Sequence, residues 1–247
     1  MITIKTKKEI ETMRQGGKKL AQIMKKLQKE VAPGIKTIDL EKLAQDEIKK
    51  AGALPSFLGY GGFPSVLCTS INEEIVHGVP SERILKQGDI ISLDLGLIWK
   101  GFHADMAKTF AVGEIDFETK RLLKVTKKVL KIAINKVKPL NTFGDIGNTI
   151  QRYVESQGFN VVRELCGHGI GKELHEDPQV FNFGKRKTGP VLKEGMVFCI
   201  EPMVTIGDFK VQKKGQFTYK TVDNSLSCHF EHMVAVTEQG SKILTEI

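Results

Sequence analysis

The chain has 247 residues, of which 40% are apolar, enough to build one large domain or two halves that share a core. It carries 37 lysines and arginines against 29 aspartates and glutamates, a formal net charge of +8. The lysines are spread along the chain, and no zinc-knuckle spacing, RNA-binding aromatic motif or long basic run accompanies them. The charge therefore indicates solvated helix faces and predicts no specific nucleic-acid ligand.

The N-terminus lacks the apolar segment of a signal peptide, and no apolar run approaches the roughly 18 residues needed to cross a bilayer. We therefore expect a cytoplasmic protein that does not bind membranes. Four cysteines lie far apart without a Cys-x-x-Cys pair, which argues against both a disulfide framework and a thiolate zinc site. We expect reduced and mostly buried thiols at Cys68, Cys166, Cys199 and Cys228.

Four amphipathic helices are predicted in two pairs, each followed by strands. Apolar residues recur at helical spacing before an Ala-Pro-Gly break, which predicts a helix over residues 7–31. Thr37 is the expected N-cap of a second helix that runs to a Lys-Lys-Ala-Gly stretch. After a glycine-rich loop and a set of strands, the pattern predicts a third helix over residues 117–137 and a fourth with Thr142 near its cap. More strands are expected up to the C-terminus.

A short internal repeat accompanies this order of elements. LKQGDIISLD at residues 85–94 matches LKEGMVFCIE at residues 192–201, with Leu-Lys-x-Gly at the front and a carboxylate at the end. PGIKTIDL and PLNTFGDI give a looser match at nearly the same offset. We therefore expect an α+β fold in a single domain, residues 1–247, made of two related halves of about 1–112 and 113–247 with an active site between them.

Two aspartates fall inside predicted strands. In DIISLDLGLIW, residues 89–99, apolar side chains alternate with a second set that includes Asp94, so Asp94 lies on the face opposite the apolar one. If residues 100–101 form a two-residue turn, Asp105 becomes a diagonal neighbour of Asp94 on the same face, with Cα atoms about 7 to 8 Å apart. A three-residue turn would separate them. Two carboxylates placed in this way require a shared proton or a cation between them.

Three further residues favour the cation. CGHGIG holds His168 between glycines, FCIEPM places Glu201 in an apolar strand, and CHFEHMVAV places Glu231 at the head of another. Together with Asp94 and Asp105 they form an oxygen-rich set with one imidazole, which suits two divalent ions such as Co, Mn, Fe or Zn.

Each of these residues also has an ordinary interpretation. Asp105 could pair with Lys108 at a strand end, Glu231 could be solvated, and His168 could be a core or capping histidine. The occurrence of five such residues in one chain favours the metal site over five separate coincidences.

Six sequence blocks resemble the signature of the type I methionine aminopeptidases, a peptidase family with the pita-bread fold. They are SINEEIVHGVP, DLGLIWKGFHAD, CGHGIG, LHEDP, IEPM and FEH, in this order, and the resemblance covers essentially the whole chain. It implies a monomeric dinuclear metallo-exopeptidase that removes the N-terminal methionine from nascent proteins and peptides and prefers a small second residue.

The resemblance also implies roles for individual residues. Asp105 and Glu231 would bridge the two metal ions, His168 and Glu201 would complete the ligands of one ion, and Asp94 those of the other. Glu201 would in addition act as general base and acid.

Two histidines and a loop match the substrate-binding positions of the family. His77 and His175 match its non-ligand histidines, which contact the scissile amide and assist proton transfer or charge stabilisation. The loop FLGYGGFPSVLC and one residue of the second half match an apolar pocket for the methionine side chain. The pocket residues would be Phe57, Tyr60, Phe63, Cys68 and Phe217.

Four positions depart from the common bacterial pattern of this family. Phe57 stands where a cysteine is frequent, Phe217 replaces a tryptophan, Leu174 replaces a phenylalanine, and Gly61 replaces a polar residue near the pocket mouth. These changes keep the pocket apolar but alter its expected shape. They therefore also affect whether the pocket accepts leucine or norleucine in place of the N-terminal methionine.

Two kinds of alternative function stay open. A prolidase-like or aminopeptidase P-like peptidase shares the five ligands but carries a large extra N-terminal domain, whereas the ligand-bearing region here begins almost at residue 1. Type II methionine aminopeptidases have a helical insertion between the last two acidic ligands, and only 29 residues separate Glu201 from Glu231. A non-catalytic binding module with the same fold would lose ligands, and all five are present. The expected partners are nascent polypeptide N-termini, and the lysines favour a transient association with the ribosome.

Overall fold

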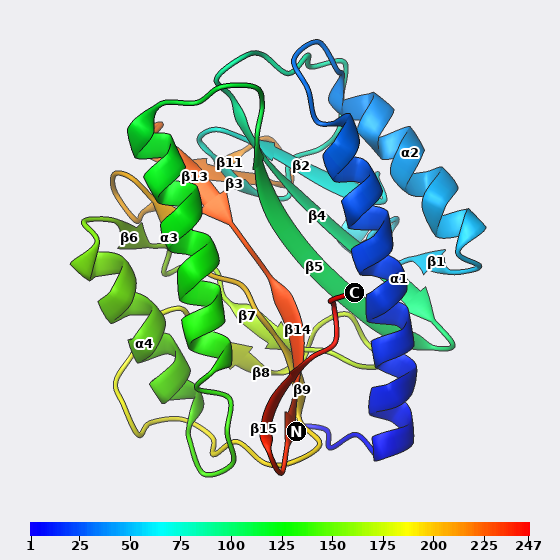
Figure 1. The fold of residues 1–247 in the computed structure, drawn as a ribbon, viewed down its shortest axis with the longest axis vertical. Coiled ribbons are helices and arrows are strands. Elements are labelled where there is room, and N and C mark those ends of the chain that lie inside the picture. The colour runs from blue at the N-terminus through cyan, green and yellow to red at the C-terminus, as the bar shows by residue number, and fades with distance from the viewer.

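The computed structural model describes residues 1–247 and places the four helices in two pairs, one on each side of a set of strands (Figure 1). The predicted order of two helices followed by strands occurs twice along the chain, as expected. None of the helices is both long and apolar enough to span a membrane. The helices are α1 (Lys7–Glu30), α2 (Thr37–Lys50), α3 (Phe117–Ile134) and α4 (Phe143–Ser156).

The caps of the two shorter helices differ. Thr142 caps α4 as predicted, in a capping box with Asp145. The prediction for Thr37 is wrong, because Lys36 is the N-cap of α2 and makes no side-chain cap. The Thr37 hydroxyl is instead engaged with Ser81, donating to its carbonyl at 2.9 Å and accepting from its N–H at 2.8 Å.

Helix α3 ends at Ile134, three residues before the predicted end. Lys138 precedes Pro139, and the residue before a proline is biased away from helical geometry. The chain therefore leaves the helix in a turn, with the N–H of Val137 donating to the carbonyl of Ile134.

The strands form four antiparallel sheets, which confirms the predicted α+β class. The first sheet contains β1 (Leu54–Pro55), β2 (Leu67–Ile71), β4 (Ile90–Trp99) and β5 (Phe102–Ala111). The second runs in the order β15-β14-β9-β7-β8, with β7 (Gly167–Gly169), β8 (Glu176–Val180), β9 (Val197–Ile200), β14 (His232–Thr237) and β15 (Gly240–Ile243).

Two smaller three-stranded sheets complete the molecule. One contains β3 (Glu74–Val76), β11 (Val211–Lys214) and β12 (Thr218–Thr221). The other contains β6 (Asn160–Val161), β10 (Met203–Thr205) and β13 (Ser227–His229). A short 3-10 helix, η1 (Tyr60–Gly62), lies in the glycine-rich loop.

The hydrophobic core consists of two main clusters. The larger one packs α1 and α2 against β2, β4 and β5, and it continues into β9 and β14. The second packs α3 and α4 against the opposite side of β9 and β14. Because both clusters share β9 and β14, the two helix pairs are held together through the central strands (Figure 1).

The turn between β4 and β5 fixes the predicted carboxylate pair. Lys100 and Gly101 form a two-residue turn with φ angles of 51° and 82°, the left-handed geometry that matches the twist of a hairpin. Asp105 lies opposite Gly96, and Asp94 lies two register positions away along the same strand as Gly96. The two aspartates therefore share one face of the hairpin, as the two-residue turn predicted.

The repeated sequence blocks have the same local structure. Ile90 begins β4 and Val197 begins β9, and a turn precedes each of them. Isolated bridges join Lys36 to Ile84 and Thr142 to Val191, so the start of α2 and the start of α4 are each anchored to the residue directly before one of the two blocks.

Candidate functional site

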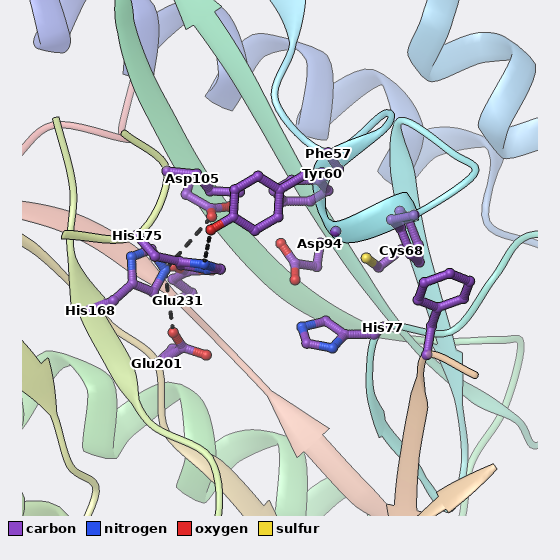
Figure 2. A pocket seen from close by; sticks show the side chains of 14 residues that line it. Phe57, Tyr60, Cys68, His77, Asp94, Asp105, His168, His175, Glu201 and Glu231 are labelled. Carbon is purple, nitrogen blue, oxygen red and sulfur yellow. Dashed lines mark hydrogen bonds and ion pairs between the residues drawn. The ribbon is translucent and has the colours of Figure 1, made fainter. Parts of the chain in front are cut away.

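A pocket of about 230 Å³ holds every residue that the sequence assigned to metal binding, catalysis or substrate binding (Figure 2). Gly61 and Leu174, two of the departures from the family pattern, also line it. The assigned residues in the pocket are Phe57, Tyr60, Phe63, Cys68, His77, Asp94, Asp105, His168, His175, Glu201, Phe217 and Glu231.

The five ligand-type residues converge from two sheets. Asp94 and Asp105 come from the β4–β5 hairpin, whereas His168 lies in β7, Glu201 directly follows β9, and Glu231 lies between β13 and β14. Carboxylate oxygens of Asp94, Asp105 and Glu231 lie within 4.8 Å of one another. The Nε2 atom of His168 lies 3.9 Å from Oδ2 of Asp105 and 3.7 Å from Oε1 of Glu201. Oxygens and one imidazole nitrogen thus point at a common space (Figure 2).

The carboxylates of this cluster are buried without positive partners. Burial raises the pKa of Asp105 well above its usual range, and the charges of Glu231 and Asp94 raise it further. Burial also raises the pKa values of the other three acids. Asp105 forms no ion pair with Lys108, which lies three residues along β5 and so on the opposite face. With an exposed fraction of 2%, Glu231 is not solvated, so both ordinary interpretations of these acids are wrong.

The donor set fits a divalent cation. One oxygen of each of Asp94, Asp105 and Glu231 is buried and has no hydrogen-bond partner. Unpaired buried carboxylate oxygens are unfavourable unless a proton or a metal ion neutralises them. Carboxylate oxygens with one imidazole are ligands that divalent transition metals accept. The residues present therefore fit the metal ions that the sequence predicted.

The orientation of His168 also suits a ligand. Its Nδ1 lies 2.9 Å from the carbonyl oxygen of Gly169, so Nδ1 carries the proton and donates it there. Nε2 is then left with a free lone pair directed at the carboxylates. Burial and the adjacent His175 ring lower the pKa of His168 to about 3, which keeps the imidazole neutral.

The two other assigned histidines flank the cluster. Tyr60 Oη lies 2.8 Å from Nδ1 of His175, and the His175 and His168 ring centroids are 4.3 Å apart. His77 follows β3 with a φ angle of 59°, a left-handed conformation uncommon for residues other than glycine and often found at functional sites. Burial, followed by the nearby His229 and His175, lowers the pKa of His77 to about 4.

Aromatic side chains form the apolar wall of the pocket. Phe63 and Phe217 pack edge to face with centroids 5.5 Å apart, and Phe57 is also buried. Gly96 makes room for Phe57, because a Cβ atom at Gly96 would lie 2.7 Å from Cε1 of that ring. The glycine opposite Asp105 thus allows an aromatic wall to stand beside the carboxylates.

Two residues that lie beside the cluster were not predicted from the sequence to belong to the site. Cys199 lies with His168 and Glu231 in a second potential ligand group, but burial and nearby carboxylates raise the pKa of its thiol well above the usual range, so it is protonated. His229 is buried with Nε2 3.4 Å from Oε2 of Glu201. The available signal was its position, two residues before Glu231 in the same block.

Known proteins are similar to this chain in both sequence and fold. The profile of metallopeptidase family M24 matches residues 11–238. The chain is 51% identical to a methionine aminopeptidase of Clostridium acetobutylicum, covering 99% of both, and 46% identical to methionine aminopeptidase 1 of Bacillus subtilis, covering all of both. The crystal structure of a methionine aminopeptidase from Thermotoga maritima superimposes with a TM-score of 0.99 at 46% identity over both complete chains.

A more distant likeness concerns the fold alone. A prolidase from Pyrococcus horikoshii has a TM-score of 0.80 at 23% identity, and the chain covers 63% of it. The predicted pita-bread fold is therefore confirmed. From the full-length identities and the family match, the chain belongs to metallopeptidase family M24, within its type I methionine aminopeptidases.

Proposed function

We propose that this chain removes the N-terminal methionine from nascent proteins and peptides by metal-dependent hydrolysis, with a preference for a small second residue. The observation that carries the proposal is the shared pocket, in which a buried carboxylate cluster adjoins an apolar aromatic wall. The wall suits a methionine side chain, and the cluster lies where the adjacent peptide bond would be. Phe57, Tyr60, Phe63, Cys68 and Phe217 would contact the methionine.

The cluster would hold two divalent metal ions, with Co, Mn, Fe and Zn as the candidates. The proposed ligands are Asp94, Asp105, His168, Glu201 and Glu231. When bound, the ions would supply a water of lowered pKa and polarise the scissile carbonyl.

The proton transfers are assigned to residues of the chain. Glu201 would take a proton from the attacking water and pass it to the leaving amine, a role that typically contributes about 10² to 10⁴ in rate. The hydroxyl of Tyr60 would donate to Nδ1 of His175, so that Nε2 of His175 carries a proton. His175 and His77, both neutral, would then donate to the peptide amide group and its developing oxyanion.

The organisation of the molecule is part of the proposal. We infer one catalytic domain, residues 1–247, whose halves of about 1–112 and 113–247 both contribute to the site. The matching local structures around β4 and β9 support it. We also infer a monomeric cytoplasmic enzyme.

A transient ribosome association is proposed on the basis of surface lysines. Several lysines of α1 and α2 line one surface hollow, which suits an acidic or phosphate-rich surface. They are Lys19, Lys25, Lys26, Lys29 and Lys50. Unchanged ribosome co-sedimentation after neutralising these lysines would remove this partner.

The decisive experiment measures free methionine released from Met-Gly-Met-Met and Leu-Gly-Met-Met. The protein is first treated with a chelator and then supplied with one of the four metals. We expect metal-dependent release from the methionine peptide and none in Asp105→Ala. Asp46→Ala, an exposed acid on α2, is the matched control and should keep full activity. No release from folded protein with any metal would exclude the peptidase function and favour the non-catalytic binding module.

A further inference from the structure

One buried histidine beside the cluster has no assigned role. His229 ends β13 with 1% of its surface exposed, and neither of its ring nitrogens has a hydrogen-bond partner. Its backbone is fixed on both sides by Thr109, whose Oγ1 accepts from the His229 N–H at 2.9 Å and donates to the His229 carbonyl at 2.8 Å. The ring is therefore held in a defined place, and its polar atoms are left for a partner inside the site.

The surroundings of the ring point to that partner. Its Nε2 lies 3.4 Å from Oε2 of Glu201, whereas the other oxygen of Glu201, Oε1, lies 3.7 Å from Nε2 of His168. Glu201 thus stands between two imidazoles, one for each carboxylate oxygen. His229 does not line the pocket, so it contacts Glu201 from behind.

The chemistry of imidazole decides which atom donates. An ionised carboxylate oxygen only accepts hydrogen bonds, so an imidazole nitrogen that binds it must carry the proton. A proton on Nδ1 would be a buried donor without a partner, which is unfavourable, whereas a proton on Nε2 faces an acceptor oxygen of Glu201. The two atoms lie close enough for a hydrogen bond but are not aligned as one in this structure.

We propose that His229 is a positioning residue for Glu201. Its Nε2–H donates to Oε2 of Glu201, which leaves Oε1 free and directed toward His168, where Glu201 is proposed to bind metal. The inference rests on the proposed function for the role of Glu201, but the contact itself concerns metal binding and can be tested without turnover.

Two amide variants test the contact, because their side chains place an N–H donor at different distances from the backbone. The amide nitrogen of glutamine stands near the position of Nε2, whereas that of asparagine stands near Nδ1. Both retain a polar donor, so a general effect of polarity or burial acts on both. We expect His229→Gln to retain Mn²⁺ affinity within about threefold, and His229→Asn to lose about 10- to 100-fold in affinity, as is typical when a partner of a metal ligand is removed.

Two readouts separate this role from structural damage. Calorimetric titration of Mn²⁺ into chelator-treated protein gives the affinity, and the visible absorption of Co²⁺-loaded protein reports the ligand geometry. We expect an altered Co²⁺ spectrum in His229→Asn only. In steady-state assays at saturating metal, kcat of His229→Asn should fall. Its KM for Met-Gly-Met-Met should stay unchanged, because His229 does not line the substrate pocket.

The outcomes are distinct. Equal Mn²⁺ affinities and Co²⁺ spectra for the Gln and Asn variants would overturn the proposal. If both variants fail to fold, a long-range ¹H–¹⁵N correlation spectrum of the wild-type protein decides, since a proton on Nδ1 instead of Nε2 would also overturn it. If the wild-type protein binds metal but releases no methionine, the proposed function fails, whereas the metal titration still tests His229.

Discussion

Nε2 of His168 lies 3.9 Å from Oδ2 of Asp105, although the two residues belong to different sheets. This separation is too long for a hydrogen bond and matches two ligands of one metal ion. Asp105 is therefore the residue through which the β4–β5 hairpin and the β7 strand would share an ion, and it is the most informative position to change.

Asp105→Asn should strongly weaken metal binding with little change of shape. An amide removes the negative charge and one of the anionic oxygens, so we expect Mn²⁺ affinity to fall by about 100-fold or more and methionine release to reach background. Calorimetric titration and the peptide assay provide the measurements. Asp46→Asn serves as control, and full retention of affinity in Asp105→Asn would contradict the ligand role.

The same substitution should stabilise the chelator-treated protein. Burial and neighbouring carboxylates raise the pKa of Asp105 above its usual 3.8, so its contribution to folding is greatest below pH 3.8 and is lost as the pH rises through the folded-state pKa. Asp105→Asn should raise the free energy of unfolding, and by more at about pH 8 than at about pH 5. Urea unfolding of the wild-type protein and of Asp105→Asn measures the difference. The pH-dependent contributions of the histidines are common to both proteins and largely cancel.

Tyr60→Phe should weaken catalysis without weakening the fold. Tyr60 is 46% exposed and contributes a 2.8 Å hydrogen bond to Nδ1 of His175. Loss of one such bond is worth about 0.5 to 1.5 kcal/mol, so we expect kcat/KM to fall by about twofold to 13-fold. Steady-state kinetics and thermal unfolding should be compared, and unchanged kcat/KM would show that the bond does not orient His175.

Gly96→Ala should disturb the methionine pocket. The new Cβ would lie 2.7 Å from the Phe57 ring and 2.9 Å from Cβ of Ser56, so the ring, which lines the pocket, must shift. We expect a raised KM for Met-Gly-Met-Met and a loss of about 1 to 3 kcal/mol in unfolding free energy. Gly16→Ala, which crowds Trp99 from α1, is the control and should leave KM unchanged.

Lys5→Met should loosen the segment that carries His175. Nζ of Lys5 lies 2.7 Å from Oε2 of Glu176, and Oε1 of Glu176 accepts from the N–H of Lys172 at 2.9 Å. Breaking a buried pair on one side costs about 3 to 5 kcal/mol, because the other charge is left unpaired. We expect lower stability and lower kcat. The double variant with Glu176→Gln should be less destabilised than the sum of the two single variants, and simple additivity in urea unfolding would contradict the coupling.

Much of this protein follows from local features of its sequence. Helical periodicity predicts the helices, and the strand period of two with a turn at residues 100–101 places Asp94 and Asp105 on one face. These features depend only on neighbouring residues, so they can be read along the chain. The sequence blocks that resemble the family also named all the residues that the fold then gathers into one pocket.

Only the tertiary structure determined the contacts between residues that are far apart in the sequence. Thr37 is a good cap by residue type, yet Ser81 engages its hydroxyl. His229 became notable only when the fold buried its ring beside Glu201 without another partner. No local pattern contains these contacts, because they arise from the packing of segments that are far apart in the sequence, and packing determines which polar atoms are left unpaired.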